Sequence, residues 1–187
     1  KEIDKSFLSK LNLLIQDKSA KKIQHLISNF HIADIAEIMK LLPIEDSNYL
    51  FQLINHEKSA LILLEIEEDL RKYILSSLSS KEIANTVIAN LESDDATDIM
   101  STLSIKKKKA VLSFIKDDQA NDIEELLNYS ENSAGGVMAT ELIKVNENWS
   151  TMMCLKEMRK QAVNVKQVHT IYVVNNDDIL LGSLSLK

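Results

Sequence analysis

The stretch Asn132-Ser133-Ala134-Gly135-Gly136-Val137-Met138 divides this 187-residue sequence into two parts. Before it, apolar residues recur at helical spacing and glycine is absent; after it, short apolar runs are typical of β-strands. Two of the three glycines stand here side by side. Paired glycines give the backbone unusual freedom and let another group approach the main chain closely. We therefore expect this stretch to join two structural units and to act as a hinge or a ligand contact.

The part before the glycines, residues 3–129, predicts about ten short helices, because its apolar faces are interrupted every ten to twelve residues or so. Four interruptions share one design, an apolar residue followed within a few positions by acids: Leu42-Pro43-Ile44-Glu45-Asp46, Leu64-Glu65-Ile66-Glu67-Glu68, Leu91-Glu92-Ser93-Asp94-Asp95 and Ile115-Lys116-Asp117-Asp118. Acids are favoured in the first turn of a helix by the helix dipole. The repeat predicts a mainly α fold, a superhelical stack of short helical hairpins, or α-solenoid.

The part after Gly136 predicts a small α/β unit. Its expected elements are a strand over Glu141–Val145, a helix over Ser150–Gln161 that begins at a Ser150 or Thr151 cap, a buried strand over Ile171–Val174, a turn over Asn175–Asp178 and a strand over Ile179–Leu186. Gly182 is expected where a neighbouring backbone or a ligand comes close. The methionines Met152, Met153 and Met158 and the single cysteine, Cys154, are expected to pack in the core of this unit.

The composition limits the classes of function. An apolar fraction of 45% is ordinary for a folded protein, and the net charge of −6 argues against nucleic acid as a partner and favours cations or basic partners. No apolar run approaches the roughly 20 residues that span a bilayer, and no signal peptide is recognisable. We expect the chain to begin inside a longer protein. It has no glycine-rich phosphate loop, nucleophile elbow or Cys/His pair, so we expect no enzyme and no catalytic residue.

Three segments together resemble the cytosolic region of MgtE-type magnesium transporters: Ser133–Glu141, Ile171–Val174 and Leu181–Leu186. In that family a superhelical N-terminal domain precedes a pair of cystathionine-β-synthase (CBS) domains, a plug helix and a transmembrane pore. The resemblance implies that residues 1–131 are the N-terminal helical domain and residues 132–187 the junction and a truncated first CBS domain. It also implies a location at the cytoplasmic face of a bacterial membrane and a homodimer in the full-length protein. The partners implied are the remaining CBS domain, the plug helix and the transmembrane domain.

The acids of the third interruption are the candidate metal ligands. With Ser93 as the expected N-cap, Asp94 and Asp98 lie one turn apart on the same face of a helix. Mg2+ takes oxygen ligands, keeps several waters and needs only one or two carboxylates. From residue type alone, acids in a first turn are more often dipole partners or a solvated face. The resemblance implies that Asp94 and Asp98 bind Mg2+ and that the backbone carbonyl of Gly136 helps to hold the ion.

No other site is predicted. The acids Asp117, Asp118 and Asp122 and the acids Glu67, Glu68 and Asp69 are expected to be solvated. Some members of the family bind ATP through an aromatic residue just before the Ile171 strand, where this chain has Thr170, so no cofactor-binding residue is expected.

The resemblance leads to one function and leaves two alternatives. The function is Mg2+ sensing, in which ion-dependent closure of the N-terminal and CBS domains gates a pore that these residues do not include. One alternative is a helical-repeat scaffold resembling flagellar motor-switch proteins, which binds proteins without sensing ions. The other is a CBS-type nucleotide sensor.

Overall fold

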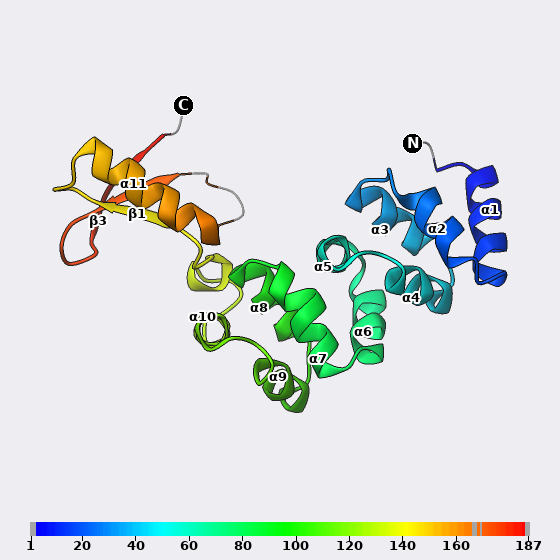
Figure 1. The fold of residues 1–187 in the computed structure, drawn as a ribbon. Helices are drawn as coiled ribbons and strands as arrows, with labels where there is room; N and C mark the ends of the chain where they lie inside the picture. Colours follow the sequence, from blue (N-terminus) through cyan, green and yellow to red (C-terminus); the bar gives the residue numbers. More distant parts are fainter. Residues whose placement is uncertain (1–2, 166–167, 169, 186–187) are drawn as a thin grey trace.

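The computed structural model describes residues 3–165, 168 and 170–185. A curved stack of short helices runs from the N-terminus, and a small sheet covered by one helix follows it at the far end of the arc (Figure 1). Within these described residues, no helix is both long and apolar enough to cross a membrane. The fold is mainly α with a small α/β unit, as predicted.

Each even-numbered helix of the arc from α4 to α10 begins at one of the acid-containing interruptions. This confirms the predicted repeat of helix starts. The elements of the arc are α1 (Lys5–Gln16), α2 (Ala20–Ile27), α3 (Ile32–Lys40), α4 (Ile44–Gln52), α5 (His56–Glu65), α6 (Glu68–Ser77), α7 (Ser80–Glu82), the π-helical turn η1 (Ile83–Val87), the 3-10 turn η2 (Ile88–Asn90), α8 (Ser93–Ser101), α9 (Ile105–Leu112) and α10 (Asp117–Leu126). In all four cases, acids occupy the first helical turn, where they face the positive end of the helix dipole.

Successive hairpins stack through two layers. In one layer α3 contacts α5, α5 contacts η1, and α7 contacts α9; in the other α4 contacts α6 and α8 contacts α10. One continuous apolar core joins the layers, and fully buried residues such as Ile38, Ile62 and Ile99 lie in it. Each hairpin buries its apolar face on the next, which is the packing of an α-solenoid.

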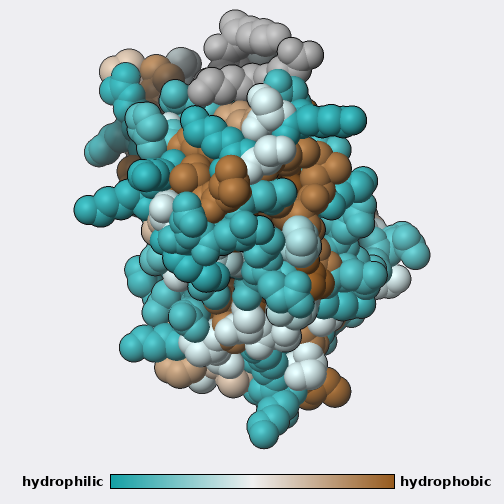
Figure 2. Space-filling model, turned by 90° about the vertical axis from the view of Figure 1, so that its right-hand side faces the viewer, coloured by the Kyte–Doolittle hydropathy of each residue, from teal (hydrophilic) through white to brown (hydrophobic). Residues whose placement is uncertain are grey.

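The outer surface of the arc is mostly hydrophilic. Figure 2 views the molecule from the side of the N-terminal helices and shows teal side chains over most of it, with apolar side chains gathered mainly in the upper half. The four consecutive lysines of α9 belong to the charged surface, but Lys107 is an exception. Its Nζ donates hydrogen bonds to the carbonyl oxygens of Leu75 and Leu78, at 2.6 and 2.9 Å, at the C-terminal end of α6. A lysine here satisfies carbonyls that the end of a helix leaves without an intrahelical donor.

We expect Lys107→Met to destabilise the protein by about 1–2 kcal/mol, because it removes two hydrogen bonds from a charged donor to the end of α6. Lys106→Met makes the same chemical change at an exposed neighbour and should change the unfolding free energy by less than about 0.5 kcal/mol. Urea denaturation followed by circular dichroism measures both. Equal effects of the two substitutions would show that the Lys107 contacts contribute nothing.

The C-terminal unit has the predicted order of elements. It contains β1 (Ile143–Asn146), α11 (Thr151–Gln161), the 3-10 turn η4 (Ala162–Asn164), β2 (Ile171–Val174) and β3 (Leu180–Leu184). The strand order is β1-β2-β3, with β1 and β2 parallel and β2 and β3 antiparallel. Ser150 caps α11, as one of the two predicted caps, by accepting a hydrogen bond from the backbone N–H of Met153.

This unit has a small core of its own, and several of its apolar side chains stay exposed. Ile143, Val145 and Ile171 form the core, and Cys154 and Met158 pack against it half-buried. The prediction that Met152 and Met153 are buried is wrong, because α11 buries no residue fully and Met152 is 77% exposed. The prediction for Gly182 is wrong for a close backbone contact, because a Cβ added there would meet nothing within 4 Å in the described structure; a ligand contact there stays a prediction. Leu186, the last residue of the predicted strand, lies outside the described residues.

Candidate functional site

The N-terminus of α8 carries the two predicted carboxylates. Asp94 lies in the first turn of α8 and is half-buried, and Asp98 follows one turn later with its side chain mostly exposed. Partial loss of hydration raises the pKa of the Asp98 carboxyl above its usual range, and the like charge of Asp94 raises it further. The two carboxylates therefore interact, as their spacing on one helix face predicts.

A third acid, Glu131, also affects this pair. Its negative charge is the next contribution that raises the pKa of Asp98. Glu131 lies in the loop after α10, 33 positions from Asp98 in the sequence, and our sequence analysis missed it. The only available signal was its place immediately before the glycine-containing stretch, which by itself does not predict proximity to α8.

The backbone at Gly136 lies against the same loop. Gly135 and Gly136 belong to a 3-10 turn, η3 (Gly135–Val137), and neither glycine has a positive φ. A Cβ added to Gly136 would lie 2.2 Å from the carbonyl oxygen of Ser130 and 2.9 Å from the Cα of Glu131. A Cβ added to Gly135 would lie 2.5 Å from ring atoms of Tyr129. The structure therefore requires these glycines for close packing, while their backbone conformation is one that any residue adopts.

Arg71 contributes positive charge near the acids. Its charge opposes the rise in the pKa of Asp98. The same guanidinium donates through Nη2 to the carbonyl oxygens of Leu64 and Ile66, at 2.9 and 3.1 Å, and so holds the end of α5. Its Nε is buried and has no hydrogen-bond partner among the described residues. Arg71 compensates part of the negative charge around Asp98, although the net effect of the surroundings still raises the pKa.

The prediction that Ser93 is the N-cap of α8 is wrong. Ser93 is the first helical residue, and Glu92 occupies the cap position without a side-chain cap bond to the helix. The reason is a contact from far along the chain. The carboxylate of Glu141 accepts hydrogen bonds from the Ser93 backbone N–H, at 2.9 and 3.2 Å, and from the Ser93 hydroxyl, at 2.8 Å.

The donor chemistry at this place suits a hydrated hard cation. Within the described part of the chain, no three His, Cys, Asp or Glu side chains are grouped closely enough to hold one metal ion. Mg2+ commonly keeps several waters and takes one or two protein carboxylates, so a full set of protein ligands is not needed. Asp94 and Asp98 supply such carboxylates, and after partial loss of hydration the like charge of Asp94 is the next cause that raises the pKa of Asp98.

The acidic turn at the start of α6 differs from this one. Glu67 forms an ion pair with Lys40, with 2.9 Å between carboxylate oxygen and Nζ, and Glu68 forms one with Lys72 on the next turn of α6. The side chains of both pairs are exposed. Glu67 and Glu68 have cationic partners, whereas the pKa of Asp98 is raised by partial loss of hydration and then by the charges of Asp94 and Glu131.

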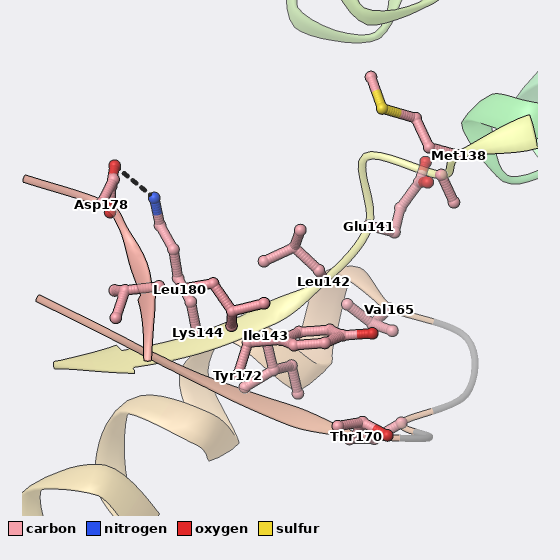
Figure 3. A pocket seen from close by; sticks show the side chains of 13 residues that line it. Met138, Glu141, Leu142, Ile143, Lys144, Val165, Thr170, Tyr172, Asp178 and Leu180 are labelled. Carbon is pink, nitrogen blue, oxygen red and sulfur yellow. Dashed lines mark hydrogen bonds and ion pairs between the residues drawn. The ribbon is translucent and has the colours of Figure 1, made fainter. Parts of the chain in front are cut away.

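A separate cavity of about 580 Å3 lies on the sheet of the C-terminal unit (Figure 3). The walls are mainly apolar, and the ring of Tyr172 lies between Leu142 and Thr170. At one end Lys144 pairs with Asp178, with 2.8 Å between Nζ and Oδ2. Lys144 is the only cation among the described residues that line the cavity, so a phosphate group would have to compete with Asp178 for it.

Comparisons with known proteins agree with the fold and the order of the elements. The model of the MgtE intracellular N domain family matches residues 30–132. The magnesium transporter MgtE of Enterococcus faecalis is 30% identical over 70 residues, which are 37% of this chain and 16% of that protein. The magnesium transporter MgtE of Thermus thermophilus is 24% identical over 178 residues, which are 92% of this chain and 39% of that protein.

Among solved structures, the cytosolic domain of the Mg2+ channel MgtE in complex with ATP superposes with a TM-score of 0.84. It is 21% identical in sequence, and the match covers 96% of this chain and 73% of that one. At this identity the match shows a shared fold. The chain spans at most 39% of the length of the two curated relatives.

Proposed function

The chain belongs to the MgtE intracellular N domain family, and from this premise we propose that it is the cytosolic Mg2+-sensing region of a bacterial magnesium transporter. Residues 1–131 would form the N-terminal domain, and residues 132–187 the junction and the first part of a CBS domain. The observation that carries the proposal is the pair of carboxylates one turn apart on α8, Asp94 and Asp98: partial loss of hydration raises the pKa of Asp98, and the charges of Asp94 and Glu131 raise it further. Gly136 packs closely on the loop that carries Glu131, since a Cβ added there would lie 2.9 Å from the Cα of Glu131.

The proposed mechanism is electrostatic. When Mg2+ is plentiful, it binds at Asp94 and Asp98 with help from the Gly136 carbonyl, and acids from the rest of the transporter complete its ligands. The neutralised surfaces close on one another and hold the pore shut. When Mg2+ falls, the carboxylates repel and the domains separate. Each tenfold preference of an ion for the closed arrangement contributes about 1.4 kcal/mol toward closure, so a few ions suffice to shift the population.

The partners in this proposal are the other domains of the full-length transporter. The remaining CBS domain, the plug helix and the transmembrane domain would receive the signal, at the cytoplasmic face of the membrane and within a homodimer. Both relatives compared above are named magnesium transporters, which supports Mg2+ as the ion sensed and transported.

In the full-length transporter, we expect the double substitution Asp94→Asn, Asp98→Asn to weaken the Mg2+-dependent protection of the N-terminal domain from proteolysis. Both changes keep side-chain size and remove the charge that attracts the ion. Limited proteolysis over a series of Mg2+ concentrations should show the midpoint of protection moved at least about tenfold higher, the equivalent of about 1.4 kcal/mol.

The matched control is Asp117→Asn, Asp118→Asn, which removes the same charge from the first turn of α10. This variant should keep the wild-type midpoint. If both double variants shift the midpoint equally, the effect comes from net charge and the assignment of Asp94 and Asp98 is wrong.

A further inference from the structure

A hydrogen-bonded cluster connects the start of the C-terminal unit to the N-terminus of α8. We call it the Ser93–Glu141 latch, and it consists of Ser93, Thr97, Thr140 and Glu141. The Ser93 hydroxyl donates to Glu141 Oε2 at 2.8 Å and accepts from the Thr140 backbone N–H at 2.8 Å and from Thr140 Oγ1 at 3.0 Å. The Ser93 backbone N–H also donates to the same carboxylate, and Thr97 Oγ1 donates to the Ser93 carbonyl at 2.7 Å.

The latch is shielded and is strengthened by charge. Ser93 is 1% exposed and Thr97 is 9% exposed, so little water competes for these bonds. The acceptor is an ionised carboxylate at the positive end of the α8 dipole, an arrangement that gives stronger hydrogen bonds than neutral groups do. Glu141 is among the residues that line the cavity, and Figure 3 shows its carboxylate on the side toward the green helix. Glu141 therefore performs the N-capping role that Ser93 was expected to perform.

The latch lies between the two units and connects them. On one side lies α8, which carries Asp94 and Asp98; on the other lies β1, which begins two residues after Glu141. Residues 93 and 141 are 48 positions apart, so the latch closes a loop that contains α9, α10 and both glycines of η3. Rotation at Gly135 and Gly136 therefore cannot carry Glu141 away from α8 while these bonds hold.

We propose that Glu141 is a positioning residue that locks the C-terminal unit onto the N-terminus of α8 and so sets the orientation of the sheet relative to Asp94 and Asp98. Any effect on ion binding rests on the proposed function, whereas the locking itself does not. In this proposal the hydrogen bonds of the four latch residues, and not the flexibility of the glycines, fix the orientation of the two units. Breaking it would leave both units folded and free to change their relative orientation.

The test measures that orientation by pulsed electron paramagnetic resonance on the 187-residue chain. Spin labels are placed at Ser101→Cys, on the last turn of α8, and at Met152→Cys, on α11, in a Cys154→Ser background; both label sites are exposed. With the latch intact we expect one narrow distance distribution. Glu141→Ala should broaden it roughly twofold or more, because the two units then populate several orientations. Glu141→Gln, which keeps one acceptor oxygen but no charge, should give an intermediate width.

The control is Glu147→Ala, which removes an exposed acid six positions further along and should leave the distribution unchanged. Circular dichroism establishes that each variant keeps its helix content. A double-mutant cycle with Ser93→Ala tests the contact itself. Ser93 and Glu141 act through one contact, so Glu141→Ala should broaden the distance distribution less in a Ser93→Ala chain than in the wild type. A distribution in Glu141→Ala as narrow as in Glu147→Ala would overturn the proposal.

The proteolysis test separates this proposal from the proposed function. If Glu141→Ala broadens the distance distribution and Asp94→Asn, Asp98→Asn leaves the Mg2+ midpoint of the full-length transporter unchanged, the latch is supported and Mg2+ sensing by these residues fails. If that midpoint moves but the distribution of Glu141→Ala equals that of the control, sensing is supported and the latch is rejected.

Discussion

Ile99→Ala is expected to destabilise the protein by about 2–5 kcal/mol, the largest effect that we predict. Ile99 is completely buried on α8, in the core where this helix contacts α5 and α10. Removing its side chain loses the burial of about three carbons and leaves a cavity that the surrounding helices can close only in part. With a total stability of order 5–15 kcal/mol for a native protein, the loss is a large share of the whole.

Thermal unfolding followed by circular dichroism measures this effect, and the midpoint should fall by roughly 5–15 °C. Ile105→Ala is the matched control, because it makes the same chemical change at the start of α9, where Ile105 is 76% exposed. It should alter the free energy of unfolding by less than about 0.5 kcal/mol. Similar effects at both positions would mean that α8 is not packed as described.

Gly136→Ala is expected to cost about 2–3 kcal/mol through overpacking. The added Cβ would lie 2.2 Å from the carbonyl oxygen of Ser130, a main-chain atom that cannot rotate away as a side chain can. The φ angle of Gly136 is not positive, so the cost comes from the clash and not from backbone strain. The junction loop must shift to relieve it, and this moves Glu131 relative to Asp98.

Gly182→Ala gives the matched control, since a Cβ there meets nothing within 4 Å and β3 is exposed. Its effect on the midpoint of urea unfolding should be close to zero. Gly135→Ala offers a further check because its clash is with the side chain of Tyr129. The cost of Gly135→Ala should fall when Tyr129 is also replaced by alanine. If Gly136→Ala and Gly182→Ala unfold alike, the close packing at the junction is wrong.

Much of the fold could be predicted because its signals are local. The acids at Glu45, Glu68, Asp94 and Asp117 mark helix starts through the dipole of their own helices, and the structure begins a helix at or next to each of them. The alternation around Ile143 and the apolar run from Ile171 predict strands for the same reason, since side-chain direction repeats within the segment itself.

The errors share one cause, which is the dependence of each position on parts of the chain distant from it. Ser93 has a residue type that favours an N-cap, yet Glu141 takes over that role from 48 positions away. Gly182 was predicted to have a close backbone or ligand neighbour, yet a Cβ added there would meet nothing within 4 Å in the described structure. Met152 was predicted to be buried, yet it is exposed. Among the described residues of α11, Cys154 and Met158 are the ones that pack against the small core.

The candidate site likewise contains some residues that the sequence predicted and others that it did not. That Asp94 and Asp98 share a helix face follows from their spacing and was confirmed, whereas their binding of Mg2+ stays a prediction. Glu131 and Arg71 could not be assigned to this neighbourhood from the sequence, because one lies in a loop and the other on α6. Their influence on Asp98 depends on how the hairpins stack and on where the junction loop turns.

The sequence by itself determined the helical repeat, the change to a β-containing unit at Gly135 and Gly136, and the carboxylate pair of α8, because each depends on neighbours within one or two turns. Only the tertiary structure decided that these glycines serve close packing on Tyr129 and Ser130, and that Glu141 caps α8. The physical reason is that steric contact and hydrogen bonding act through space, and chain separation carries no information about them until the helices have stacked.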